Sequence, residues 1–102
     1  MFKYEKDNDN IVTVTMDMQG RSANVINQEF GKLWLETIDR LESEKAEIAG
    51  VVLTSAKSTF FAGADIDDLF KQTDAKLIFE MCEGLKKQLR RLETLGKPVV
   101  AA

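Results

Sequence analysis

A short turn of small residues is the part of this chain best suited to chemistry. Residues 60–66 read Phe-Phe-Ala-Gly-Ala-Asp-Ile; they follow an apolar run, 50–54, and precede acids that could open a helix. In such a turn, backbone N–H groups can point outward and stabilise an oxygen that gains negative charge. The alternative interpretation is a plain connection whose small residues only let a strand and a helix pack closely. The end of a buried strand, where α/β folds bind ligands, favours the first interpretation.

The composition excludes several other kinds of site. There is no histidine, which removes Ser-His and Cys-His nucleophile pairs and His-based metal sites. Neither Gly-x-Gly-x-x-Gly nor Gly-Lys-Ser/Thr occurs, so nucleotide phosphate loops are not expected. The net charge of −3 argues against general attraction to nucleic acid or anionic lipid. One cysteine, Cys82, excludes an internal disulfide and fits a reducing compartment, and we expect neither a signal peptide nor a membrane span.

The remaining sequence predicts the order β-β-α-β-α-β, which indicates an α/β layer structure. Strands are expected at 2–6, 11–16 and 50–54, the last covered on both faces, and a final strand from Pro98. Asn27 is expected to cap a helix, and one or two helical turns are expected at 65–70. The predicted core positions of the first helix are Phe30, Leu33, Trp34, Ile38 and Leu41; those of a longer helix over 75–94 are Leu77, Ile78, Met81, Leu85, Leu89 and Leu92.

Four segments, in register along the whole chain, resemble the crotonase (enoyl-CoA hydratase/isomerase) superfamily. They are RSANVIN at 21–27, GVVLTS at 50–55, FFAGADI at 60–66 and GKPVVAA at 96–102. The sequence of the third segment, 60–66, is most similar to the N-terminal hydratase module of multifunctional fatty-acid oxidation proteins. The resemblance implies the N-terminal part of an α/β fold built from ββα spiral repeats. On this basis residues 1–102 are expected to form an incomplete domain, cut before the second oxyanion loop and the catalytic glutamates.

The resemblance also assigns roles around the small-residue turn. It places the backbone N–H of Ala64 in an oxyanion hole, facing a thioester carbonyl. The carbonyl of Ala62 would accept a hydrogen bond from the adenine of CoA, and Gly63 would allow close approach. Asp65 and Ile66 would line the start of the acyl pocket. Relatives commonly carry a lysine directly after this motif, whereas position 67 here is an aspartate.

A second loop is assigned to CoA in the same way. Its candidate binding residues are Arg21, Ser22, Ala23 and Val25. Arg21 stands where relatives often have a basic residue near a CoA phosphate, although a lone arginine in a turn is more often solvated.

Two clusters of charged residues are better explained by structure than by function. Asp65, Asp67 and Asp68 would favour a helix N-terminus rather than hold a metal. A basic cluster at 86, 87, 90 and 91 could meet an anionic CoA or a partner chain, but a solvated helical face is favoured.

The implied function is that of an enzyme, an enoyl-CoA hydratase (lyase)/isomerase of fatty-acid β-oxidation, with this segment inactive by itself. Coenzyme A would enter as part of the acyl-CoA substrate, no cofactor would be held here, and a downstream 3-hydroxyacyl-CoA dehydrogenase domain could bind NAD. The resemblance further implies a homo-oligomer or a complex with a thiolase, in the bacterial cytoplasm rather than the mitochondrial matrix. Alternatives are another crotonase reaction (thioester hydrolase or decarboxylase), a non-catalytic acyl-CoA-binding or assembly fragment, or an unrelated α/β domain.

Overall fold

The computed structural model describes residues 1–63 and 75–102. Its elements are, in chain order, β1 (Phe2–Lys6), β2 (Ile11–Met16), α1 (Gln28–Glu44), the 3-10 turn η1 (Lys45–Glu47), β3 (Gly50–Ser55), α3 (Ala75–Glu93) and β4 (Val99–Ala101). The predicted order β-β-α-β-α-β is therefore confirmed over the described residues. The helical turns expected at 65–70 lie outside them.

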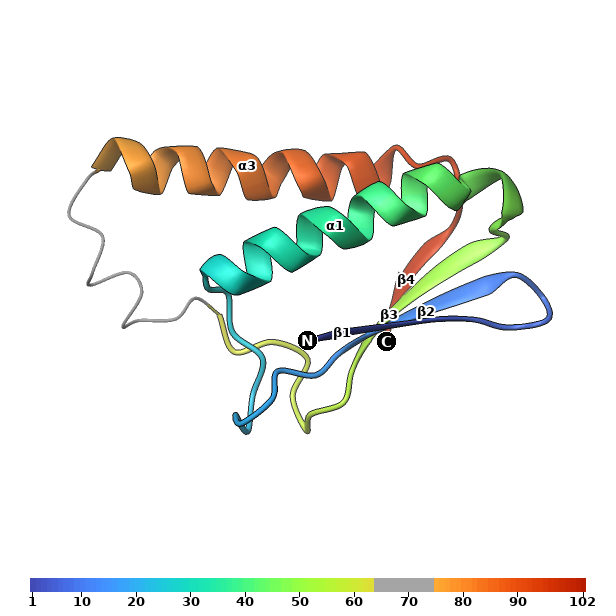
Figure 1. The fold of residues 1–102 in the computed structure, drawn as a ribbon, viewed down its shortest axis with the longest axis horizontal. Coiled ribbons are helices and arrows are strands. Elements are labelled where there is room, and N and C mark those ends of the chain that lie inside the picture. Colours follow the sequence, from blue (N-terminus) through green and yellow to red (C-terminus); the bar gives the residue numbers. More distant parts are fainter. Residues whose placement is uncertain (64–74) are drawn as a thin grey trace.

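The four strands form one sheet in the order β1-β2-β3-β4. β1 runs antiparallel to β2, while β2, β3 and β4 are parallel to one another. α1 and α3 are the crossovers between the parallel strands, and both lie on the same side of the sheet (Figure 1). The parallel strands therefore end at one common edge, where the loops that follow β2 and β3 meet.

The expectation that β3 is covered on both faces was wrong. Val51, which faces the helices, is 2% exposed, whereas the next residue, Val52, is only half-buried. The physical reason is that both crossover helices pack on one side of the sheet. A short run of apolar residues does not reveal that, because it suits a singly covered strand as well.

Helix α1 begins as its sequence predicts, and four of its five predicted core positions are buried, whereas Leu33 is only half-buried. The side chain of Asn27 accepts a hydrogen bond of 2.8 Å from the Phe30 N–H, which caps the helix. Its buried face then packs on the inward side chains of β2. That face consists of Phe30, Trp34, Thr37, Ile38 and Leu41, and the β2 residues are Val12, Val14 and Met16. Spacing of three and four residues on the helix thus meets alternation on the strand.

The predicted core face of α3 is covered only in part. Leu92 is buried, but Leu77, Met81 and Leu89 remain 42%, 39% and 45% exposed. The C-terminal part of α3 reaches the core through Leu92, and its N-terminal end extends beyond the start of α1 (Figure 1). The apolar side chains of α3 do lie at helical spacing, but the described residues cover only the C-terminal end of the face they form.

An arginine on α3 holds the two helices together. The Arg91 guanidinium donates to both Glu42 carboxylate oxygens, at 2.8 Å each, and to Asp39 at 2.6 Å. Hydrogen bonding from Arg91 keeps the pKa of Glu42 below its ordinary range, and the same pairing raises the pKa of Arg91. Bidentate pairing of this kind fixes the orientation of both partners. Two other members of the basic cluster pair along α3: Lys86 with Glu83 and Arg90 with Glu93.

Arg91→Met should lower the free energy of unfolding by about 1 kcal/mol, toward the upper end for ion pairs at a surface, because two carboxylates lose their partner. The matched control is Arg90→Met, since Arg90 and Glu93 are 75% and 65% exposed. That variant should change stability little. Urea unfolding of both variants measures the difference. Equal effects would contradict a special role for Arg91.

The same pair predicts a pH dependence. The pKa of Glu42 is lower in the folded chain than its ordinary value of 4.5. On acidification the unfolded chain therefore binds a proton first, and the stabilisation present at neutral pH is lost as the pH falls below about 4.5 and through the folded pKa. The stability difference between the wild-type chain and Arg91→Met should shrink over that range. A difference that stays constant down to acid pH would show that Arg91 acts through packing alone.

Candidate functional site

The loops that follow β2 and β3 lie together at the carboxyl edge of the sheet. Residues 17–27 follow β2 and residues 56–63 follow β3, and Figure 1 shows the two loops side by side. Two backbone hydrogen bonds of 2.8 Å join them: the Ala62 N–H donates to the Asn24 carbonyl, and the Ile26 N–H donates to the Gly63 carbonyl. The two segments that the sequence assigns to CoA therefore form one surface, where ligands of α/β sheets commonly bind.

One buried side chain organises this junction. Asn24 is 0% exposed, and its amide nitrogen donates to the Met16 carbonyl at 3.2 Å and to the Ser55 hydroxyl at 2.8 Å. Its amide oxygen accepts from the Met18 N–H at 3.0 Å. A single asparagine thus satisfies polar groups at the ends of both β2 and β3. Asn24 is not among the residues that the sequence predicts to have a role, and its only sequence signal is a carboxamide inside a loop of small residues.

An ion pair supports the same junction from outside. The Lys57 ammonium lies 2.9 Å from the Asp17 carboxylate, and the Lys57 side chain is only 17% exposed. Hydrogen bonding from Lys57 lowers the pKa of Asp17. The Ser55 hydroxyl that accepts from Asn24 also accepts from the Lys57 N–H at 3.0 Å. These contacts fix the first residues after β2 and β3, which lead into the candidate site.

Aromatic rings fasten the second loop to α1. Phe61 is half-buried and meets Phe30 edge-on, with ring centroids 5.2 Å apart and an interplanar angle of 76°. Phe30 in turn stacks on Trp34 at 5.8 Å and 14°. Edge-to-face and stacked rings of this kind add to ordinary apolar burial. Because Phe61 faces the core, the next two residues, Ala62 and Gly63, are left exposed.

Gly63 has a backbone conformation that other residues avoid. Its φ is +97°, and a Cβ built on it would meet no atom of the described residues within 4 Å. The requirement for glycine is therefore conformational, and no side chain of residues 1–63 or 75–102 crowds this position. Among the described residues, no backbone N–H donates to the carbonyl of Ala62.

The structure brings together most of the residues predicted to bind CoA. Arg21 and Ser22 are exposed, and Ala23 and Val25 are half-buried, on the loop that pairs with Ala62 and Gly63. The predicted oxyanion residue Ala64, with Asp65 and Ile66 of the predicted acyl pocket, lies outside the described residues, as do Asp67 and Asp68.

Residues 1–63 and 75–102 contain no candidate metal cluster and no candidate membrane span. No group of three or more His, Cys, Asp or Glu side chains is placed to hold a metal ion. In the same part of the chain, neither helix has the length and apolar character needed to span a bilayer.

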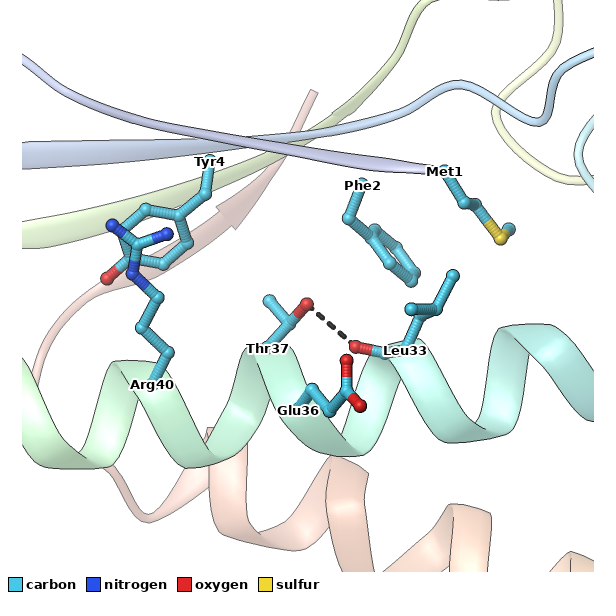
Figure 2. A pocket seen from close by; sticks show the side chains of 7 residues that line it. All are labelled: Met1, Phe2, Tyr4, Leu33, Glu36, Thr37 and Arg40. Atoms are coloured by element: carbon cyan, nitrogen blue, oxygen red, sulfur yellow. Dashed lines mark hydrogen bonds between the residues drawn. The ribbon is translucent and has the colours of Figure 1, made fainter.

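A pocket of about 270 Å³ lies elsewhere, between β1 and α1 (Figure 2). It is lined by Met1, Phe2, Tyr4, Leu33, Glu36, Thr37 and Arg40. The Arg40 guanidinium lies 3.7 Å from the centroid of the Tyr4 ring, and the Tyr4 hydroxyl donates to Glu44 at 2.6 Å. Burial and this hydrogen bond raise the pKa of Tyr4. None of the candidate CoA residues lines this pocket.

Comparison with known proteins agrees with the geometry. Residues 6–102 match the family described as enoyl-CoA hydratase/isomerase. The chain is 38% identical over 107 residues to the fatty acid oxidation complex subunit alpha of Shewanella halifaxensis, and 29% identical over 102 residues to that of Aliivibrio fischeri. In each case 99% of this chain is covered, but it spans only 14% and 15% of those relatives.

Solved structures show the same fold. Enoyl-CoA hydratase from Mycobacterium smegmatis superposes with a TM-score of 0.87 at 18% identity, and the match covers 98% of this chain and 38% of that one. The enzyme from Bacillus anthracis gives 0.84 at 20% identity, with the same coverage. These structures confirm the predicted fold class, the N-terminal part of a crotonase-like α/β fold. Because the family match extends over nearly the whole sequence, the chain belongs to the enoyl-CoA hydratase/isomerase family.

Proposed function

We propose that the loops after β2 and β3 belong to an enoyl-CoA hydratase/isomerase that acts on acyl-CoA thioesters in fatty-acid β-oxidation. They would bind CoA and form part of the oxyanion hole. The observation that carries this proposal is the pairing of Asn24 and Ile26 with Ala62 and Gly63 at the carboxyl edge of the sheet. It unites the two segments whose sequences resemble CoA-contacting loops. The family membership and the relatives named for fatty acid oxidation support the substrate class.

CoA would lie across both loops. The Ala62 carbonyl, to which no described backbone N–H donates, would accept from the adenine amino group. The lack of a side chain at Gly63 would let the nucleotide approach the backbone closely. Main-chain groups and small side chains of Ser22, Ala23 and Val25 would contact the pantetheine and adenine portions. Arg21 would supply positive charge near a phosphate.

The chemistry would rest on an electrostatic contribution from Ala64. Hydration or double-bond shift in an unsaturated thioester passes through an enolate-like state with negative charge on the thioester oxygen. A preorganised N–H donor at that oxygen lowers the barrier by on the order of 3 kcal/mol. The family's second donor and its carboxylate pair, which moves protons, match no residues in 1–102. We therefore expect this chain by itself to bind an acyl-CoA without turning it over.

The intact protein would be larger. We propose that residues 1–102 form an incomplete domain of a multifunctional protein, completed by the second oxyanion loop and the catalytic glutamates. The chain covers 14–15% of the fatty acid oxidation relatives, which leaves room for a dehydrogenase domain that binds NAD. Assembly with a thiolase or as a homo-oligomer, and a bacterial cytoplasmic location, are proposals on the same basis.

Gly63→Ala should weaken binding of crotonoyl-CoA at least about tenfold, because a strained or shifted turn no longer admits the nucleotide. The matched control is Gly96→Ala: its φ is +86° and its Cβ would also meet no described atom within 4 Å, but it lies beyond the end of α3. Both variants should lose about 1 kcal/mol of stability, so only binding separates them. Isothermal titration with crotonoyl-CoA measures that binding.

Equal affinity of the two glycine variants would remove Gly63 from the site. Failure of the wild-type chain itself to bind crotonoyl-CoA would contradict the proposed role of both loops.

Asn24→Asp should destabilise the chain by about 3 kcal/mol, because a buried carboxylate would replace the donor to Met16 and Ser55. It should also weaken crotonoyl-CoA binding, since both loops depend on this side chain. The same chemical change at the helix cap, Asn27→Asp, is the control and should be near neutral, because aspartate caps helices as well as asparagine does. Urea unfolding measures both variants. A neutral effect at position 24 would show that the junction does not depend on its amide.

A further inference from the structure

No strand of the described residues lies beside the outer edge of β1. β1 is the first strand of the sheet and pairs only with β2 among the described residues. The Asp7 N–H donates to the Ile11 carbonyl at 3.0 Å, and the Asp17 N–H donates to the Met1 carbonyl at 2.7 Å. In an antiparallel pair, residues bonded to the partner strand alternate with residues that are not. Odd-numbered residues of β1 therefore bond to β2, and the backbone groups of even-numbered residues point outward.

The side chains of β1 divide in the same alternation. Phe2 and Tyr4 are half-buried and point toward α1, as Figure 2 shows. Lys3 and Glu5 lie on the other face of the sheet, with side chains 71% and 59% exposed and 3.6 Å apart. The edge thus offers outward backbone groups at Phe2, Tyr4 and Lys6, and a free face on which a positive and a negative charge follow one another.

We propose that this edge binds a second copy of the same chain, with the two β1 strands antiparallel about a twofold axis at Tyr4. Phe2 then lies opposite Lys6 of the second copy, and Tyr4 lies opposite Tyr4. These pairs carry the outward backbone groups, so each exchanges both N–H···O bonds. On the exposed face, Lys3 lies opposite Glu5 of the second copy, and Glu5 lies opposite Lys3. Each charge therefore meets its opposite across the interface.

Charge selects this register over its neighbours. A twofold axis at Lys3 would set two lysines directly opposite, and an axis at Glu5 would set two glutamates opposite. Like charges in opposed positions destabilise a strand pair, whereas opposite charges stabilise it. Only the register at Tyr4 combines complementary charges with pairing of all five strand residues. Charges on an edge strand normally oppose pairing with another strand. In β1, the order of Lys3 and Glu5 instead favours pairing with a second copy in a single register.

The pocket beside β1 agrees with this arrangement. It is lined by Phe2 and Tyr4 of the edge strand and by one side of α1, and no residue of β2 lines it. It therefore opens toward the free edge, where a second copy would cover it. The interface is separate from the candidate CoA loops, so it depends on no part of the proposed function.

Sedimentation equilibrium of the 102-residue chain tests the proposal with charge reversals at the edge. Glu5→Lys or Lys3→Glu should raise the dimer dissociation constant at least about tenfold, because each creates two like-charge pairs. The double variant Lys3→Glu/Glu5→Lys should dimerise like the wild-type chain, since positions 3 and 5 are again opposite in charge. An equimolar mixture of the two single variants should form a heterodimer for the same reason. Glu80→Lys, an exposed reversal on α3, is the matched control and should leave the dissociation constant unchanged.

Thermal unfolding monitored by circular dichroism checks that each variant is folded. A monomeric wild-type chain would overturn the proposal. Dimerisation that Glu5→Lys leaves unchanged would also overturn it and point instead to β4 or α3, as would failure of the double variant to recover. Recovery in the mixture is the decisive support for the edge pairing, because the ion pair between positions 3 and 5 of one chain stays broken in both single variants.

Discussion

The candidate site depends on a buried carboxamide. The side chain of Asn24 connects the carbonyl of Met16, the N–H of Met18 and the hydroxyl of Ser55. Its backbone carbonyl accepts a hydrogen bond from the Ala62 N–H. Without these bonds, polar groups at the ends of two parallel strands would be buried without partners, which is costly. The bonds also set the separation of the two loops that carry the candidate CoA residues. Stability of the junction and geometry of the site therefore have the same physical origin.

The rest of the fold holds that junction in place. Because both crossovers lie on one side of the sheet, α1 can reach the β3 loop through the contact between Phe30 and Phe61. Arg91 fixes α3 against α1 through its ion pairs with Glu42 and Asp39. The loops at the carboxyl edge thus rest on a packed layer, while Ala62 and Gly63 stay at the surface. Rigid elements that present exposed loops are the usual basis of a binding site.

Local patterns predicted most of the elements, and contacts distant in sequence explain the failures. The alternation of inward and outward side chains in β2 and the helix cap at Asn27 depend only on residues near in sequence. The local sequence is therefore enough to predict both the strand and the start of the helix. Coverage of β3 and α3 depends on where the helices pack, which periodicity does not encode. Asn24 was missed because two of its partners, Met16 and Ser55, are 8 and 31 residues away. Its polar character alone resembles that of any loop asparagine.

The proposed function requires the loops at 21–25 and 62–64 to bind one acyl-CoA together. Nuclear magnetic resonance of the ¹⁵N-labelled chain, titrated with crotonoyl-CoA, tests it most directly. Binding across both loops predicts saturable shifts at one common dissociation constant for the amides of Ser22, Ala23, Val25, Gly63 and Ala64, with the amides of β1 unchanged. Shifts confined to the pocket between β1 and α1, or the absence of any saturable shift, would contradict it.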